Sequence, residues 1–492
     1  MRRRDFLRAG MAGAVVASAG GAVAASARRL PNVLYVFSDQ HRAVSMPGEV
    51  LNEAMAPNLD RFRKANFSMD RCISNYPLCT PYRGILMSGR WPFQTGLVKN
   101  NIALGTDERS LGHHFRGNGY RTAYVGKWHL QGRGVKFVPP GPGRQGFQDW
   151  HVWANTNAHY KSWTYDPESG ERIQPRGWNC TLMTDQAVSF IDAQENSNSP
   201  WFLVVSWNPP HPPFNPPPED RRRYRGGHLA KRPNARLREE QGENIPRPLH
   251  SEAALQKAMA GYYGGITGVD GEFQRLLDIL DKTGQAENTI VIYTSDHGEM
   301  MGSHGRMAKQ VPFEESCRVP FFVRYPGRTI AGGRSGTLFA AIDIYPTLCG
   351  LAGVPVPSHC AGRDFSAVMT GGHAQASRSA FLINHVEQAP DAAAREGRKK
   401  PRPMRERVRQ FVNLPSYRGV RTDTHTYAVA ETGRWCLYDN VADPFQTKNL
   451  IADPAQRVLM EALDADIMAW LKEANDPFPY AEAVTRVSNF PT

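Results

Sequence analysis

The sequence predicts an α/β fold with a mostly parallel central sheet flanked by helices, followed by a smaller C-terminal subdomain of antiparallel strands and a helix. Over most of the chain, short continuous apolar runs typical of strands buried on both faces alternate with helical patterns. From about residue 378 the pattern changes to closely spaced short strands and one last helix. A chain of 492 residues can hold two packed units.

The expected elements follow the chain in order. Strands are predicted in the first unit at residues 33–37, 122–125, 201–206, 289–294 and 319–323. Helices are predicted at residues 57–67, directly after Cys79, and at residues 185–196 and 251–283. Because strands and helices alternate, the sheet should be mostly parallel, with helices on both faces. In the second unit we expect strands at 417–422, 426–430 and 435–439, then a helix at 454–475.

Polar residues that can take part in catalysis or ligand binding follow four of the predicted strands. They are Asp39, Lys127, His211 and Asp296, each close to the end of a different apolar run. In open α/β sheets, ligands bind beyond the carboxyl ends of the strands. We therefore expect these four side chains to lie around one site.

Two of these strand ends carry a pair of possible metal ligands. Asp39 is followed by Gln40, and Asp296 by His297, which together give an oxygen-rich set with one nitrogen. Hard cations such as Ca²⁺ prefer oxygen donors. The alternative is that Asp296 caps the next helix and His297 is an ordinary hydrogen-bonded polar residue.

Cys79, Pro81 and Arg83 have the spacing of a nucleophile at a helix N-terminus. Proline suits the first helical turn, where its missing N–H costs no hydrogen bond. Free backbone N–H groups and the positive end of the helix dipole attract anions there. Arg83 adds a permanent charge with forked donors. The alternative is a buried or disulfide-bonded cysteine in an ordinary turn.

This Cys-x-Pro-x-Arg run resembles the signature of the formylglycine-dependent (type I) sulfatases, a family of the alkaline phosphatase superfamily. Three further segments resemble motifs of that family in the same order along the chain. They are Gly-Lys-Trp-His-Leu at 126–130, Asn-Pro-Pro-His-Pro-Pro-Phe at 208–214, and the segment 305–309 ahead of 312–315, which carries Lys309. The resemblance implies an alkaline-phosphatase-like fold and hydrolysis of a sulfate monoester, a sulfuric ester hydrolase activity.

The resemblance also implies roles for individual residues. A maturation enzyme would oxidise Cys79 to formylglycine, whose hydrated aldehyde is the nucleophile. Asp39, Gln40, Asp296 and His297, together with the residue at Cys79, would hold one divalent metal. Many members have Asp-Asp and Asp-Asn where this chain has Asp-Gln and Asp-His, so Ca²⁺ is expected and Mn²⁺ or Zn²⁺ stay open.

The remaining implied roles concern charge and proton transfer. Arg83, Lys127 and Lys309 would neutralise the sulfuryl oxygens. His211 would protonate the leaving alkoxide, and His129 would take a proton from the second hydroxyl of the hydrate to expel sulfate. The division of acid and base roles between His129 and His211 is left open. Two other functions also remain open: a phosphodiester or phosphonate monoester hydrolase of the same superfamily, and an inactive glycan-binding protein.

The N-terminus resembles an export signal. Residues 1–27 combine Arg3-Arg4-x-Phe6-Leu7, a weakly apolar Gly/Ala segment and small residues at 25–27, as in a twin-arginine signal peptide. A disordered basic tail is the alternative. No later stretch is apolar over a membrane-spanning length. We expect a periplasmic or secreted bacterial protein with a catalytic domain at 28–377 and a C-terminal subdomain at 378–492.

The net charge of +12 is concentrated in three segments. Residues 1–30 carry +5, residues 215–250 carry +4 and residues 391–409 carry +5. The two internal stretches could attract a polyanionic substrate such as a sulfated glycan, or could be ordinary solvated surface. An exported protein with no recognition motif is not expected to bind nucleic acid. The sequence does not indicate an oligomeric state.

The chain has seven cysteines, an odd number for an exported protein. With Cys79 set aside, the other six would suffice for three disulfides. Free buried cysteines are the alternative. No Cys-x-x-Cys pair indicates zinc or redox chemistry.

Overall fold

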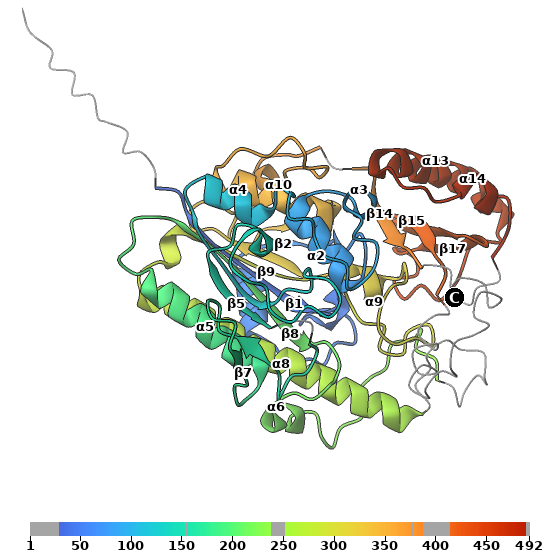
Figure 1. Ribbon diagram of the computed structural model, residues 1–492. Coiled ribbons are helices and arrows are strands. Elements are labelled where there is room, and N and C mark those ends of the chain that lie inside the picture. Colours follow the sequence, from blue (N-terminus) through green and yellow to red (C-terminus); the bar gives the residue numbers. More distant parts are fainter. Residues whose placement is uncertain (1–28, 154–155, 238–250, 376, 387–413, 489–492) are drawn as a thin grey trace, which may run out of the picture.

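The computed structural model describes residues 29–153, 156–237, 251–375, 377–386 and 414–488 (Figure 1). The predicted signal peptide at 1–27 lies outside the described residues. So do the whole basic stretch 391–409 and residues 238–250 of the other internal basic stretch.

A large sheet forms the centre of the described chain. Its strands, in spatial order, are β12 (Arg334–Ser335), β2 (Phe67–Met69), β11 (Phe321–Arg324), β9 (Thr289–Ser295), β1 (Asn32–Asp39), β8 (Trp201–Pro210), β4 (Arg121–Lys127), β5 (Asp149–Trp153), β6 (Thr164–Tyr165) and β7 (Arg172–Ile173). The five central strands, from β9 to β5, are all parallel. The predicted mostly parallel sheet is therefore confirmed.

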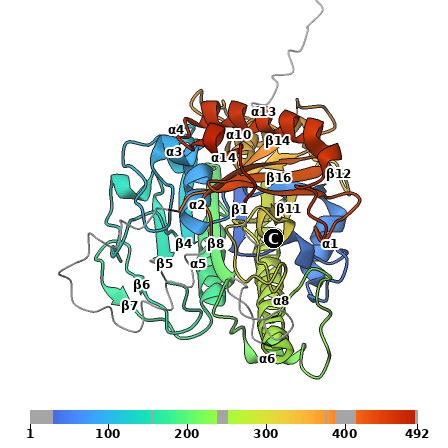
Figure 2. The same cartoon turned by 90° about the vertical axis from the view of Figure 1, so that its right-hand side faces the viewer.

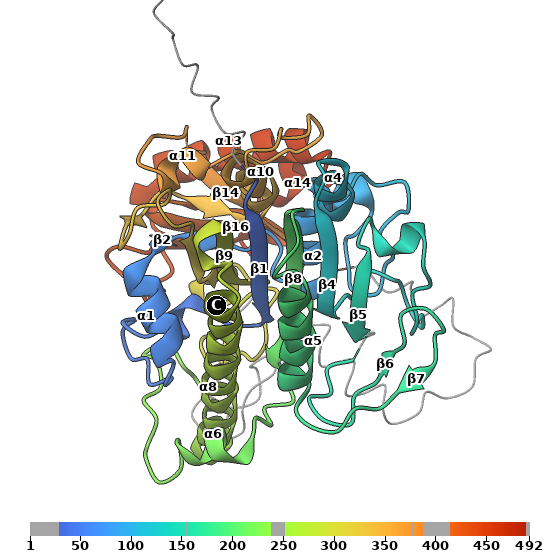
Figure 3. The same ribbon diagram turned by 90° about the vertical axis from the view of Figure 1, so that its left-hand side faces the viewer.

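Helices cover both faces of this sheet. They are α1 (Pro57–Ala65), α2 (Cys79–Ser88), α3 (Pro92–Thr95), α4 (Leu111–Gly117), α5 (Asn179–Ala193), α6 (Pro218–Arg222), α8 (Glu252–Lys282), α9 (Glu314–Cys317), α10 (Ala341–Ala352) and α11 (Ser366–Met369). Short 3-10 turns lie at Ala43–Ser45, Pro142–Arg144 and Ala286–Asn288. Figure 3 shows α1, α5 and α8 on one face, with α2, α4 and α10 on the other.

The central strand β1 is buried over its whole length, as its continuous apolar run predicts. Its side chains alternate between the two faces of the sheet. Leu34 and Val36 pack with the α1, α5 and α8 side, whereas Tyr35 and Phe37 pack with the α2, α4 and α10 side. Ser38 and Asp39 follow this apolar run at the carboxyl end of β1 and are buried as well.

The C-terminal subdomain is an antiparallel four-stranded sheet covered by a helix (Figure 2). Its strands are β14 (Ser379–Asn384), β15 (Tyr417–Thr422), β16 (His425–Ala430) and β17 (Gly433–Asp439). The 3-10 turn Pro454–Gln456 leads into α13 (Arg457–Ala474), and α14 (Tyr480–Ala483) follows. This small sheet and its helix confirm that part of the predicted fold. Asn75 joins it to the first unit, because its side chain donates to the Phe381 carbonyl and its own carbonyl accepts from the Ile383 N–H.

Some predicted elements differ from the structure. The helix predicted at 57–67 ends at Ala65, since Phe67 begins β2, and the helix predicted from 185 begins at Asn179. The strand predicted at 319–323 is interrupted at Pro320, which has no N–H to donate. Its first part, β10 (Arg318–Val319), joins β3 (Cys72–Ile73) and β13 (Phe339–Ala340) in a small sheet, and its second part, β11, enters the large sheet antiparallel to β9.

The three disulfides that the cysteine count allows do not form, and the alternative of free cysteines holds. All seven cysteines are free, and six of them are buried. Cys72, Cys180, Cys317 and Cys436 each have a pKa raised by burial, as expected of thiols that act as small apolar core residues.

Candidate active site

Four adjacent strands bring the predicted polar residues to one edge of the sheet. Asp39 ends β1, Asp296 directly follows β9, Lys127 ends β4 and His211 directly follows β8. These strands are neighbours in the order β9, β1, β8, β4, and all run in the same direction. Their carboxyl ends therefore meet, which is why residues about 260 positions apart in the sequence share one site.

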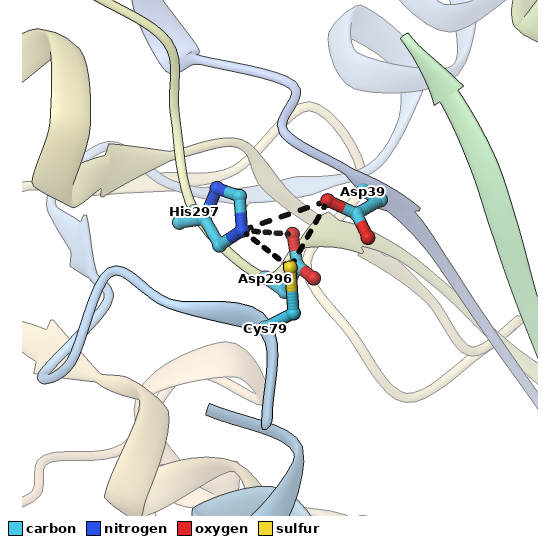
Figure 4. Close-up of side chains that lie close together, drawn as sticks. All are labelled: Asp39, Cys79, Asp296 and His297. Carbon is cyan, nitrogen blue, oxygen red and sulfur yellow. Dashed lines mark hydrogen bonds and ion pairs between the residues drawn. The ribbon is translucent and has the colours of Figure 1, made fainter. Parts of the chain in front are cut away.

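Four side chains form a compact buried cluster at this edge (Figure 4). Asp39, Cys79, Asp296 and His297 each offer a ligand atom, and these atoms lie within 4.8 Å of one another. His297 Nε2 lies 3.3 Å from Cys79 Sγ and 3.5 Å from one oxygen of each aspartate. The predicted pairing of two strand ends with the start of a helix is thus present in the structure.

Helix α2 brings Cys79 to this cluster. Cys79 is its first residue, preceded by Leu78 in extended conformation, and Pro81 falls in the first turn as expected. The helix ends at Gly89, whose φ of 66° is a left-handed conformation that glycine adopts without strain. All ten residues of α2 are buried, so the helix that carries Cys79 is part of the core.

Arg83 lies one turn along α2 and faces the same cluster. Its guanidinium contacts Asp296 at 3.2 Å and Asp39 at 3.4 Å, and it also donates to Ser206 Oγ at 2.7 Å. The guanidinium carbon lies 4.8 Å from the centre of the Phe37 ring. Arg83 is therefore fixed on all sides, with its charge directed at the two aspartates.

Lys127 contributes a second buried cation. Its ammonium lies 2.5 Å from Asp39 Oδ2 and 3.7 Å from Cys79 Sγ. The preceding residue, Gly126, has a φ of 109°, and a Cβ there would lie 2.0 Å from the Ser206 carbonyl oxygen. Only a glycine allows β4 to approach β8 this closely. Gly126 thus helps to set where Lys127 is directed.

The cluster holds two buried carboxylates that differ in proton affinity. Burial and the charge of Asp39 raise the pKa of Asp296 to about 6. Burial would also raise the pKa of Asp39, but the charge of Lys127 above all holds it well below its usual range. Burial and Asp39 act to raise the pKa of the Cys79 thiol, yet the two lysines hold it well below its usual value. Two buried carboxylates this close together repel each other when both are ionised. A divalent cation bound between them would relieve this repulsion.

The two predicted catalytic histidines lie near this cluster. His129 has a φ of 61°, Nε2 is 3.3 Å from Asn101 Oδ1, and Nδ1 is buried without a hydrogen-bond partner. His211 Nδ1 lies 2.6 Å from the Pro212 carbonyl. Desolvation lowers the pKa of both rings, and Lys309 lowers that of His211 further. The pKa of each of these two imidazoles is therefore below that of a histidine in water.

Gln40 and Lys309 stand just outside the four-residue cluster. The Gln40 backbone N–H donates to Asp296 Oδ1 at 3.0 Å. Its side chain, however, bonds to the Lys309 ammonium and to the Glu299 carboxylate. The structure therefore links these two predicted residues to each other.

Three neighbours of the site carry no role in the sequence-based prediction. Asn157 Oδ1 lies 3.0 Å from the Lys127 ammonium, and Asn100 Oδ1 accepts from the Thr80 N–H at 2.9 Å in the first turn of α2. Both lie in irregular segments whose path no periodic pattern reveals. Glu299 follows His297 by two residues, and that proximity was a signal in the sequence.

Comparison with known proteins identifies the family of this chain. The family model described as Sulfatase matches residues 31–354, which include every residue of the site.

The chain belongs to the sulfatase family.

Individual relatives agree with this assignment. The ulvan-active sulfatase of Formosa agariphila is 32% identical over 466 residues, which cover 94% of this chain and 84% of that protein. The endo-4-O-sulfatase of Bacteroides thetaiotaomicron is 28% identical over 510 residues, covering 92% of this chain and 94% of that protein. Because the relatives are named sulfatases, this chain is a sulfuric ester hydrolase.

A solved structure supports the fold as well. A Bacteroides thetaiotaomicron protein described under the metabolism of multiple glycosaminoglycans superposes with a TM-score of 0.78 at 28% identity, over 93% of this chain and 99% of that one. The sulfatase family implies a metal site, and the buried Asp, Cys and His cluster supplies suitable donors. Among the residues that the structure describes, no helix has the length and apolar character needed to cross a membrane.

Proposed function

We propose that this sulfatase removes sulfate from a sulfated carbohydrate. The proposed reaction uses formylglycine formed at Cys79 and one divalent cation, for which Ca²⁺ is the first candidate. The observation that carries this proposal is the buried cluster in which Cys79 lies beside Asp39, Asp296 and His297 at the start of α2. The names of relatives that act on ulvan or are 4-O-sulfatases support a carbohydrate substrate.

The donor set fits both formylglycine at position 79 and a divalent cation. Two aspartate oxygens and one imidazole nitrogen converge on the position of Cys79 Sγ, where an oxygen of the hydrated aldehyde would stand. When present, formylglycine supplies an oxygen nucleophile, and the cation supplies charge that favours its ionised form. Gln40 is the fourth proposed protein ligand, with its backbone already fixed to Asp296.

The side chains around this cluster can stabilise charge and transfer protons. Arg83 and Lys127 hold positive charge against the site of reaction, as stabilisation of a developing sulfuryl charge requires. His211 and His129 each carry an imidazole beside the cluster that can exchange a proton with a group bound there. We keep His211 as the residue that would serve as general acid and His129 as the residue that would serve as base.

The proposal extends to maturation and location. A formylglycine-generating enzyme would act on Cys79, and the twin-arginine-like residues 1–27 would direct the protein to the periplasm or beyond it. Both follow from sequence motifs. We also keep the division into a catalytic domain at 28–377 and a C-terminal subdomain at 378–492.

Sulfate release from a panel of desalted sulfated oligosaccharides, nitrophenyl sulfate and choline sulfate tests this function directly. We expect turnover to be highest on one class of sulfated oligosaccharide and absent from the Cys79→Ala variant. A nitrophenyl phosphodiester in the same panel distinguishes the rival activity. Faster hydrolysis of the phosphodiester than of every sulfate ester would assign the chain to that activity instead.

A further inference from the structure

Gln40 occupies a strained and fully buried position at the edge of the cluster. Its φ is 76°, a left-handed conformation that a non-glycine residue adopts at a cost. Two hydrogen bonds hold its backbone there. The N–H donates to Asp296 Oδ1 at 3.0 Å, and the carbonyl accepts from the Tyr262 hydroxyl at 2.7 Å.

The side-chain amide of Gln40 has two chemically different ends. Its Nε2 donates to Glu299 Oε2, and its Oε1 accepts from the Lys309 ammonium. An amide can rotate by half a turn with almost no change of shape, so its surroundings must select one orientation. In the reversed orientation, an NH₂ group would face the ammonium and repel any cation beside it.

Glu299 is held so that it can make this selection. Its Oε1 already accepts two backbone N–H groups, from Met301 at 2.9 Å and from Ala308 at 2.7 Å. Its own carbonyl accepts from Arg42 at 3.3 Å. With Oε1 filled by two donors, Oε2 is the atom left to face Gln40.

We propose that Glu299 is a positioning residue that fixes the Gln40 amide with its oxygen toward Lys309 and the cation-binding cluster. The inference rests on the proposed function, because it assumes that a divalent cation binds beside Gln40. A carboxylate presents an oxygen in either orientation, whereas an amide does so in only one. The proposed role of Glu299 explains how a glutamine can act as a cation ligand at position 40. Glu299 acts through Gln40 and contacts no reacting atom itself.

Glu299→Gln is the direct test. The two backbone N–H groups would retain the new carbonyl oxygen, so the new NH₂ would face the NH₂ of Gln40 and turn that amide over. We expect Ca²⁺ to bind at least tenfold more weakly, measured by isothermal titration calorimetry on protein stripped with chelator and reloaded. Metal content after dialysis gives a second readout that is independent of turnover.

A charge-conserving exchange makes the test specific. In the double variant Glu299→Gln with Gln40→Glu, the new carboxylate at position 40 accepts from the new amide and from Lys309. We expect its Ca²⁺ affinity to return to within about threefold of the wild type. Asp343→Asn is the matched control, because Asp343 is also a buried carboxylate that accepts two backbone N–H groups, from Ala340 and Arg363. This control should leave Ca²⁺ affinity unchanged.

The outcomes separate this inference from the proposed function. Equal Ca²⁺ affinity in wild type and Glu299→Gln overturns the inference and leaves the cation site intact. If Glu299→Gln does not fold, the double variant Glu299→Gln with Gln40→Glu is the test. A tenfold loss of its Ca²⁺ affinity relative to the wild type overturns the inference. A wild-type protein that binds no divalent cation overturns both.

Discussion

Cys79 sits where three polar groups converge and where its side chain has little room to move. Its sulfur lies 3.3 Å from His297 Nε2 and 3.7 Å from both Asp39 Oδ1 and the Lys127 ammonium. We predict that active protein carries an aldehyde at this position, which peptide mass spectrometry will detect. Fully active protein with only an unmodified thiol at Cys79 would contradict the proposed chemistry.

The same residue gives a clean loss-of-function variant. Cys79→Ala should abolish turnover, because it removes the proposed nucleophile at the start of α2. The lost volume is a single sulfur atom, so we expect unfolding free energy to change by no more than about 2 kcal/mol. Sulfate release and denaturant unfolding measured on the same preparation check both parts.

Asp296 links the cation site to its surroundings through Arg83 and the Gln40 N–H. Asp296→Asn should weaken binding of the divalent cation and remove most activity, since it deletes a charge from the predicted ligand set. Asp270→Asn is a suitable control, because Asp270 is a buried carboxylate bonded to Leu59 and Asn58, away from the site. Undiminished turnover by wild type after chelation, with metal content verified as nil, would refute a metal requirement.

Most of the site was predictable from residue types at strand ends. Asp39, Lys127, His211 and Asp296 follow apolar runs, and parallel topology alone brings such ends together. The side-chain partners were not predictable. The bond from the Lys127 ammonium to Asn157 Oδ1 depends on the path of a loop, and the two partners of the Gln40 side chain, Glu299 and Lys309, lie 259 and 269 residues away in the sequence.

At the scale of elements, the packing of strand β4 against β8 requires a close approach between Gly126 and the Ser206 carbonyl. Gly126→Ala would place a methyl group 2.0 Å from the Ser206 carbonyl oxygen, at a φ that alanine adopts with difficulty. We expect a destabilisation of about 3 kcal/mol or more, together with reduced activity because Lys127 moves with the strand. Unfolding by urea and kcat measured on folded protein check this. A variant as stable as wild type would show that the strands can separate at no cost.

Helix α10 begins with a carboxyl group that should make stability depend on pH. Burial raises the pKa of Asp343 to about 7, and the same group has a pKa near 4 in an unfolded chain. The folded state therefore binds a proton that the unfolded state has lost, and this stabilising contribution disappears as pH rises from about 4 through 7. Asp343→Asn has no such group.

The comparison of slopes isolates this effect. Between pH 5 and pH 8, wild type should lose more unfolding free energy than Asp343→Asn does, whatever the difference between them at any one pH. Urea unfolding at constant ionic strength measures both curves. Parallel curves would mean that Asp343 titrates normally in the folded protein.

The elements themselves were predicted with uneven success for physical reasons. Strands buried on both faces, such as β1 and β9, are recognisable in the sequence as continuous apolar runs. The short strands β2, β5 and β10 do not, because two to five residues carry no clear period. The predicted strand at 319–323 is two strands in the structure, since Pro320 breaks the hydrogen-bonded ladder between the two sheets.

At the scale of the whole molecule, charge distribution bears on the choice of substrate. The basic stretch 391–409 lies outside the described residues, but the chain on either side is tied together by the bond from the Val386 N–H to Ser416 Oγ at 2.9 Å. Nearby, Gln310 donates to Asn384 at 3.3 Å, directly beside Lys309 in the sequence. Among the described residues, those that flank the segment 387–413 are therefore hydrogen-bonded to each other, and Asn384 contacts Gln310, the sequence neighbour of Lys309.

Deleting residues 395–409 tests whether this charge serves a polyanionic substrate. We expect KM for a sulfated oligosaccharide to rise severalfold, with less change for nitrophenyl sulfate, and the difference to shrink as added salt screens exposed charges over about 8 Å. Steady-state kinetics at low and physiological ionic strength measure this. Equal effects on both substrates, or none on either, would assign these charges to ordinary solvated surface.

The complete burial of α2 has a consequence for the timing of biogenesis. An enzyme that oxidises Cys79 needs access to the thiol and to the chain on either side, and the folded protein encloses all ten residues of that helix. Oxidation would therefore have to occur on the nascent or still unfolded chain, before β1, β4 and β9 close around it. If the twin-arginine route carries the protein across the membrane already folded, the modification must be finished in the cytoplasm. A cell that lacked the cytoplasmic oxidation step would then export a well-folded sulfatase that no later treatment could activate without first unfolding it.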